Sequence, residues 1–340
     1  MQHRLAWPLV TLAALLAVNA VFNPGFLDVE WRNGHLYGSL IDILNRAAPL
    51  VLVSLGMTLV VATRGIDISV GAVVAIAAAV AAWMVGGSVA GDASRFPLPV
   101  AIGATLAVAL VCGLWNGVLV AVAGMQPIIA TLILMVAGRG IAQLITDGQI
   151  LTVYYPPFFF IGGGHLLGVP FSIFVMLAAF AVLHLGTTRS ALGLFIQAAG
   201  INPPAARLAG VKARRLVIGA YAACGLLAGL AGLLICSNVK SADGNNAGQL
   251  LELDAILAVT LGGNALTGGR FSLAGSVIGA LVIQTLTYAI YSLGVPPEVN
   301  LVVKAIVVFS VMLLQSPEFR ASMRTLVQRP ALAASRQEQR

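Results

Sequence analysis

Long apolar segments separated by short polar ones dominate the sequence, and this pattern restricts the fold more than any other feature. A helix needs about 20 mostly apolar residues to cross a bilayer. Hydrophobic residues make up 59% of the 340 residues and charged residues only 9%, too few charges to cover a water-soluble protein. The sequence therefore predicts an all-α integral membrane protein with about ten transmembrane helices. The segments are 6–22, 47–63, 68–89, 98–123, 127–146, 170–186, 216–236, 253–266, 272–293 and 299–315. They are continuous and lack the alternation of barrel strands, so no strands are expected.

Two of these segments leave alternatives open. Segment 253–266 is short and ends in Gly262, Gly263 and Asn264, so it is either a tilted short helix or a broken helix that faces a cavity. The first segment follows Arg4 and could instead be a cleavable signal peptide.

The distribution of basic residues predicts the orientation. Segment 187–215 contains five basic residues and no acid, and the tail 317–340 is also basic, so both are expected in the cytoplasm. Six predicted spans precede segment 187–215, and four lie between it and the tail. Both numbers are even, which places both the N and C termini in the cytoplasm. The chain is thus a transmembrane domain, 1–316, with a basic cytoplasmic tail, 317–340. Eight acids then fall outside: Asp28, Glu30, Asp42, Asp92, Asp147, Asp243, Glu252 and Glu298.

Several function classes are excluded by what the sequence lacks. The three cysteines lie in apolar runs and predict no disulfides, and the four scattered histidines predict no metal site. No Gly-Lys-Ser/Thr motif is present, so the chain does not bind nucleotide through a P-loop. No nucleophile has a nearby base, so catalytic residues are not expected. The net charge is +7, and the basic residues lie beside apolar segments. This distribution fits membrane orientation rather than nucleic-acid binding.

Segment 187–215 carries the signals of two short helices. Ser190 can cap a helix that runs to Ala199 and stops at Gly200, and Asn202 can cap a second with Pro203 at its first position and Gly210 just past its end. So short a second helix needs a support. Capping alone leaves two supports open: the groove of a partner protein, or lipid headgroups.

Glycine-containing motifs predict a turn and close helix packing. In the turn from Gly65 to Gly71, Ser69 is expected to cap the third span, with Asp67 near the positive end of that helix. The pairs Gly225/Gly229 and Gly275/Gly279 predict close helix contacts.

Polar residues within or beside the spans are candidates for a solute pathway. Amide side chains offer donors and acceptors, which suits uncharged, hydroxyl-rich solutes. Few charges occur within the spans, which argues against proton or sodium coupling. Arg139 does need a partner or a wet cavity, and Lys304 is interpreted as snorkelling to the surface. The amide candidates are Asn116, Gln126, Gln143, Asn245, Asn246, Gln284 and Asn300.

The loop 147–169 contains two tyrosines and the run Phe158-Phe159-Phe160. These aromatics either form a belt at the membrane surface or dock a soluble partner.

Motifs spread in order over about residues 39–315 resemble one known family. They are Gly65-Ile66-Asp67-Ile68-Ser69-Val70-Gly71, the stretches 198–202 and 209–211, Glu252-Leu253-Asp254-Ala255-Ile256, Leu261-Gly262-Gly263 and Gly268-Gly269. This combination resembles the ribose-type sugar permeases of ATP-driven (ABC) importers. Stretches 38–39, 41–49, 130–140 and 245–248 are most similar to the galactofuranose permeases of that family. Arg64 departs from the family pattern, which usually has glycine there.

The resemblance implies a permease domain over 1–316 that moves a monosaccharide by alternating access across the bacterial inner membrane. It implies a second, related permease or a second copy of this chain. A cytoplasmic ATPase with two nucleotide-binding domains would hold ATP and Mg²⁺, no cofactor being bound by this chain, and a periplasmic protein would deliver the sugar. The ATPase-contacting stretch corresponds to Gly200, Asn202, Ala205, Ala206, Arg207 and Gly210. The alternative is an ion-coupled secondary transporter of small polar solutes.

Overall fold

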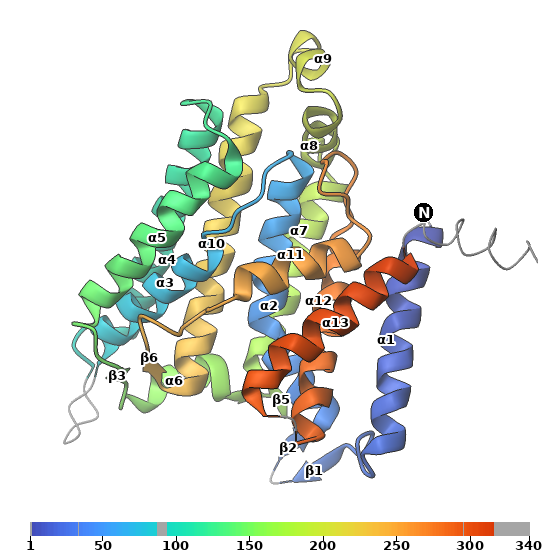
Figure 1. Cartoon of the computed structure of the whole chain (residues 1–340). Coiled ribbons are helices and arrows are strands. Elements are labelled where there is room, and N and C mark those ends of the chain that lie inside the picture. Colours follow the sequence, from blue (N-terminus) through green and yellow to red (C-terminus); the bar gives the residue numbers. More distant parts are fainter. Residues whose placement is uncertain (1, 33, 87–93, 295, 316–340) are drawn as a thin grey trace, which may run out of the picture.

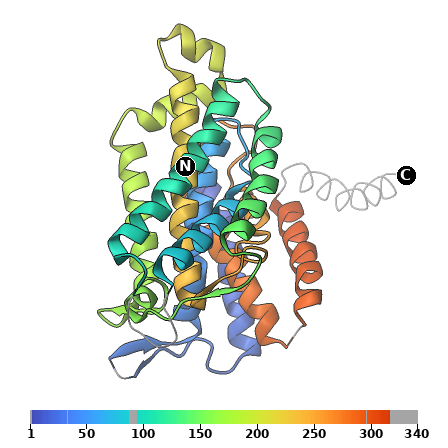
Figure 2. The ribbon, with the colours of Figure 1, turned by 90° about the vertical axis from the view of Figure 1, so that its left-hand side faces the viewer.

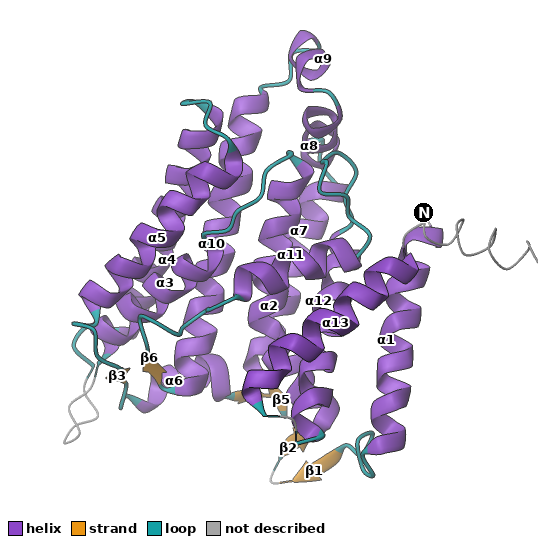
Figure 3. Ribbon diagram, viewed as in Figure 1, coloured by secondary structure: helices purple, strands orange, loops and turns teal. Residues whose placement is uncertain are grey.

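The computed structural model describes residues 2–32, 34–86, 94–294 and 296–315, and this part of the chain is largely helical (Figures 1 and 3). The predicted tail, 317–340, lies outside the described residues. The helices are α1 (Gln2–Phe22), α2 (Ser39–Ala62), α3 (Val70–Val85), α4 (Leu98–Ala121), α5 (Pro127–Ile145), α6 (Pro156–Gly163), α7 (Phe171–Thr188), α8 (Leu192–Ile201), α9 (Pro203–Leu208), α10 (Ala213–Val239), α11 (Leu251–Leu261), α12 (Leu273–Ser292) and α13 (Pro297–Gln315).

Seven of the described helices, α1, α2, α4, α5, α7, α10 and α12, are long and apolar enough to cross a membrane. All ten predicted segments contain a helix, but α3 has only 16 residues and α11 only 11. The prediction of a largely helical membrane protein is therefore confirmed, whereas the expectation of no strands is wrong. The count of ten spans and the orientation of the termini stay predictions.

The helices α8 and α9 project from one end of the bundle, which we call the hairpin side (Figures 1 and 2). The opposite end, which we call the strand side, carries three small antiparallel sheets that the sequence did not predict. They pair β1 (Glu30–Arg32) with β2 (His35–Tyr37), β3 (Leu151–Thr152) with β6 (Ser241–Ala242), and β4 (His165–Leu166) with β5 (Val169–Pro170). Each strand is only two or three residues long, which is too short to produce a visible alternation of apolar and polar residues in the sequence.

The loop 147–169 also contains the unpredicted helix α6, which begins with two prolines at its first positions. Its Phe158 is fully buried, so neither a membrane belt nor a docking role fits that side chain. Tyr154 and Phe160 are exposed, and both interpretations stay open for them.

The core is built around α2 and α10, in which most residues are buried, whereas only a minority of the residues of α1, α4, α5 and α7 are buried. Small residues let the backbones of the central helices come into direct contact. A Cβ added at Gly225 of α10 would lie 2.5 Å from the carbonyl oxygen of Ala109 in α4, and one at Gly279 would lie 2.0 Å from that of Ala258 in α11. Both predicted glycine pairs therefore lie in close helix contacts.

Helices α3 and α11 begin inside the bundle, and α11 lies across the direction of α2 (Figure 1). A Cβ at Gly71 would lie 2.1 Å from Glu252 Oε2 and 2.5 Å from the carbonyl oxygen of Gly248, so the two helix starts are in direct contact. Glu252, predicted to fall outside the spans, is only 6% exposed and is therefore buried in the bundle, while the side of the membrane on which it lies stays a prediction. The distribution of charges along the sequence does not show that a helix begins inside the bundle.

We predict that Gly225→Ala lowers the free energy of unfolding by about 1–3 kcal/mol, because the added methyl group overpacks the α4–α10 contact. The matched control is Gly219→Ala in the same helix, where a Cβ meets nothing within 4 Å. That control should be neutral or stabilising by up to ~1 kcal/mol. Thermal unfolding in detergent would compare them, and equal shifts would contradict the packing.

Candidate functional site

The predicted turn from Gly65 to Gly71 is held together by buried side chains. Asp67 and Ser69 are 1% and 0% exposed. Asp67 Oδ1 accepts hydrogen bonds from the backbone nitrogen of Ser69 (3.0 Å) and from its hydroxyl (2.6 Å). Ser69 stands at the start of α3 but its side chain makes no cap hydrogen bond, so the predicted cap is wrong. The hydroxyl instead closes a turn within the bundle, where the carboxylate is its nearest acceptor.

Asn116 of α4 belongs to this turn. It is fully buried, and its Nδ2 donates to Ser69 Oγ at 2.8 Å. Gly65 is needed here too, since a Cβ would lie 2.5 Å from the Tyr221 hydroxyl. Asp67 and Glu252 lie just outside the predicted spans, yet both carboxyls are buried in the bundle, which the sequence did not predict.

Three other pathway candidates meet between α5 and the turn 243–250. Gln143 of α5 donates to the side-chain oxygen of Asn245, and Asn246 Nδ2 donates to Asp243 Oδ2 at 2.6 Å. Arg139, which needed a partner, donates to the carbonyl oxygens of Ala247 (2.6 Å) and Asn245 (3.1 Å). The structure thus gathers Gln143, Asn245 and Asn246 into one polar seam.

The pKa of Asp243 in this seam is lowered. Partial burial raises it, but hydrogen bonds from Asn246 and from the backbone of Asn245, together with the Arg139 charge, outweigh that effect. The carboxylate therefore stays ionised and holds the turn.

The remaining candidates are dispersed. Gln126 lies at the start of α5, without a side-chain cap hydrogen bond, and Gln284 lines a cavity on the strand side. Asn300 lies in α13, but its side chain is outside the described part of the structure. Lys304 does not snorkel: its Nζ lies 2.7 Å from Asp254 Oδ2 in an ion pair between α13 and α11.

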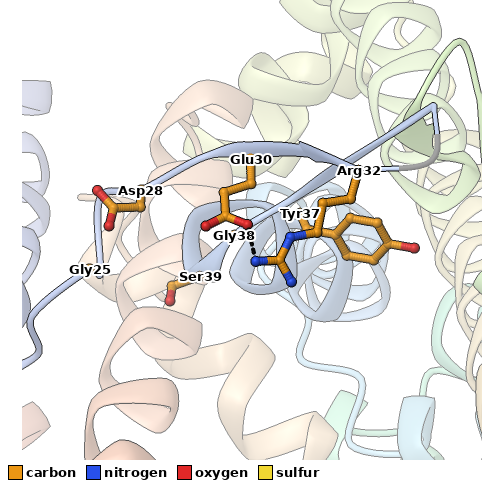
Figure 4. Close-up of a pocket in the computed structure, with 7 residues that line it drawn as sticks. All are labelled: Gly25, Asp28, Glu30, Arg32, Tyr37, Gly38 and Ser39. Carbon is orange, nitrogen blue, oxygen red and sulfur yellow. Dashed lines mark ion pairs between the residues drawn. The ribbon is translucent and has the colours of Figure 1, made fainter.

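A charged cavity of about 400 Å³ opens on the strand side between the end of α1 and the start of α2 (Figure 4). Asp28, Glu30, Arg32 and Tyr37 line it, and Arg32 forms an ion pair with Glu30. The cavity is therefore a polar surface feature at the opposite end from α8 and α9.

On the hairpin side, the second short helix has the predicted termini. Asn202 Oδ1 accepts from the backbone nitrogen of Ala205 at 3.1 Å. Gly210 has a φ of +82°, and hydrogen bonds from Gly210 to Arg207 and from Val211 to Ala206 close the helix end. The first helix differs from prediction, since Ala191 rather than Ser190 stands at its N-cap and it continues through Gly200 to Ile201. Gly200 does not end α8 because it is used for packing.

Gly200 makes a very close contact with two other segments. A Cβ there would lie 2.0 Å from the carbonyl oxygen of Ala62 and 2.6 Å from the nitrogen of Gly269. Gly269 in turn donates to that Ala62 oxygen at 2.9 Å. The end of α2, the end of α8 and the loop before α12 therefore meet at one point, which we call the junction.

Arg64 joins these segments. It has a left-handed backbone, with φ +66°. Its Nε and one terminal nitrogen each lie 2.5 Å from a carbonyl oxygen, those of Gly200 and Ile201. These carbonyls end α8 and have no partner within the helix, so a guanidinium there satisfies them and complements the helix dipole. The sequence showed Arg64 only as a departure from a pattern and gave no signal for this role.

The hairpin presents part of its surface outward. Asn202, Ala205, Arg207 and Gly210 are exposed, and Leu208 is 91% exposed, whereas Gly200 and Ala206 face the protein itself. An exposed leucine beside an exposed arginine is a surface suited to a partner groove.

Comparison with known proteins identifies the family. Residues 39–312 match the family described as branched-chain amino acid transport system / permease component. The chain belongs to this family. The match includes the turn, the junction and the hairpin, and this is a family of membrane permease components rather than enzymes. No solved structure matches the chain.

Among the permeases it resembles is the galactofuranose transporter permease protein YtfT of Escherichia coli K12, 49% identical over 94% of this chain and 93% of that protein. The fructose import permease FruF of Bifidobacterium longum is 36% identical over 98% of this chain and 94% of that protein. The ribose import permease RbsC of Escherichia coli K12 is 36% identical over 91% of this chain and 92% of that protein. The predicted resemblance to sugar permeases is confirmed.

We predict that Asn116→Leu lowers the free energy of unfolding by about 1–3 kcal/mol, because it leaves the buried turn without its donor from α4. Thr105→Val in the same helix is the control: Thr105 is also fully buried but donates only within α4, to Ala101. Its cost should be about 1 kcal/mol or less. Thermal unfolding in detergent measures both, and a larger loss for the control would contradict the assignment.

Proposed function

We propose that this chain is the permease subunit of an ATP-driven importer for a monosaccharide, galactofuranose or a similar sugar, in a bacterial inner membrane. The galactofuranose relative, at 49% identity over nearly the full length, supports the substrate class. The single structural observation that carries the mechanism is the junction, because it connects an exposed hairpin directly to two helices of the bundle core.

In this proposal the hairpin side faces the cytoplasm and α8–α9 sits in a groove of a separate ATPase, which holds ATP and Mg²⁺. A second, related permease or a second copy completes the membrane unit. A periplasmic sugar-binding protein docks on the strand side, where the cavity of Figure 4 offers carboxylates and a guanidinium. Binding of ATP moves the hairpin, and the junction passes that movement to α2 and α12. The pathway opens on one side at a time.

An ion-coupled transporter is the second candidate, and the buried Asp67 and Glu252 are the observation that favours it. Both carboxyls, however, have structural neighbours, a turn in one case and a helix contact in the other. Uptake that persists without the ATPase and responds to membrane potential would replace the proposal by this one.

We expect Arg207→Glu combined with Gly210→Pro to abolish ATP-dependent sugar uptake into vesicles that hold the complete importer. The first change reverses an exposed charge, and proline cannot adopt the φ of +82° at position 210. The matched control is Arg207→Lys with Gly210→Asn, which keeps the charge and tolerates a left-handed backbone. Normal uptake by the Glu/Pro variant would show that the hairpin does not couple the ATPase to transport.

Arg64→Gly tests the junction separately. Glycine adopts the left-handed backbone without strain, so the fold should remain intact while both hydrogen bonds to α8 are lost. We predict that sugar imported per ATP hydrolysed falls by roughly tenfold or more. Arg64→Lys, which retains the charge but not the paired donors, should give an intermediate ratio. A ratio equal to that of the wild type in Arg64→Gly would mean that Arg64 only fills space.

A further inference from the structure

A second cavity lies within this single chain on the strand side and has a volume of about 320 Å³. It is partly open and is lined by the start of α2, the end of α6, the start of α7, and the last turns of α10 and α12. Small-molecule sites in proteins range upward from roughly 300 Å³, so this space suits one small ring.

The lining is rich in neutral hydrogen-bonding groups. Asn45, Asn238 and Gln284 supply amides, Ser172 and Thr287 supply hydroxyls, and Tyr291 supplies an aromatic side chain. Gln284 is half-buried in an apolar helix, and its side chain makes no hydrogen bond within the described part of the chain. An amide left free in such a place is available to a ligand, and its two donors and one acceptor match vicinal hydroxyls.

The charges at this cavity are already paired. Asp42 and Arg46 both line it, and Arg46 Nε lies 2.9 Å from Asp42 Oδ2. An amino acid would require an unpaired carboxylate for its ammonium group and an unpaired cation for its carboxylate, and its side chain would need an apolar pocket. The described lining provides neither of these unpaired charges, although it does contain apolar side chains, those of Leu234, Ile235 and Val239, and the family description names branched-chain amino acids.

We propose that this cavity is a binding site for an uncharged monosaccharide, located inside one permease chain rather than between two. This inference rests on the proposed function and assigns its substrate class to a place. The sugar makes contacts with Gln284 of α12 and with the side-chain nitrogen of Asn45 of α2, because the side-chain oxygen of Asn45 already accepts a hydrogen bond from Ser172. Tyr291, which is 53% exposed, lies at the rim of the cavity.

The test places a reporter cysteine in the cavity of the complete importer in vesicles. Thr287→Cys is introduced together with Cys112→Ala, which removes the one native cysteine that is not buried. We measure the rate of modification by a small water-soluble methanethiosulfonate with and without D-galactose, D-ribose or D-fructose. At least one sugar should slow the reaction by about fivefold or more, and L-leucine should not.

Two further variants make the result specific. Leu293→Cys, at the end of the same helix and outside the cavity, should react at one rate with or without sugar. Adding Gln284→Leu to the Thr287→Cys chain should remove the protection by sugar, because an apolar side chain cannot form hydrogen bonds with hydroxyls. Protection by leucine, protection that survives Gln284→Leu, or no protection by any of the three sugars would overturn the site.

Uptake by the wild-type importer separates this result from the proposed function. Sugar uptake without protection at position 287 keeps the importer and overturns the cavity as its sugar site. Protection without ATP-dependent uptake supports the site and overturns the importer.

Discussion

The guanidinium of Arg64 and the missing side chain of Gly200 together hold three segments that are far apart in sequence. Arg64 bonds the last carbonyls of α8, and Gly200 lets that helix end reach the backbone of Ala62 and Gly269. Without this junction, α8 and α9 would be tied to the bundle mainly through the connections to α7 and α10. A two-turn helix such as α9 has little stability of its own, so its position depends on what anchors α8. Any movement of the hairpin therefore reaches the end of α2 and the loop before α12 through this contact.

The sequence predicted best those features that depend on near neighbours. The cap at Asn202 and the left-handed Gly210 are set within a few residues, and both are present. Gly200 has the same local signature as a helix end, yet α8 continues through it, because a contact with Ala62 more than 130 residues away decides its role. Ser69 failed as a cap for a similar reason: its acceptor, Asp67, is local, but the burial that makes that bond preferable comes from α4 and α10.

The pathway candidates show a second limit. An amide in an apolar segment reveals that a polar group is buried, but not which neighbour satisfies it. Asn116 donates to Ser69 in the turn and Gln143 donates to Asn245, whereas the side chain of Gln284 makes no hydrogen bond in the described structure. These three look alike in the sequence because the angular position of a side chain on its helix is set by helix packing. The burial of Glu252 was not predicted for the same reason, since α11 starts inside the bundle rather than at its surface.

The junction and the strand-side cavity are linked by continuous helices. Helix α2 ends at Ala62, two residues before Arg64, and carries Asn45 near its start. Helix α10 begins directly after the hairpin and carries Asn238 at its end, and α12 follows Gly269 and carries Gln284. Protein interiors are close-packed and deform as rigid elements rather than continuously. A shift of the hairpin therefore changes the tilt of the same helices that form the cavity walls. Because the cavity holds its ligand by neutral hydrogen bonds, each worth about 1 kcal/mol, a small change in wall spacing is enough to release a sugar. A site built from strong ion pairs would resist that release, so weak neutral contacts suit a permease whose energy input arrives from the other end of its helices.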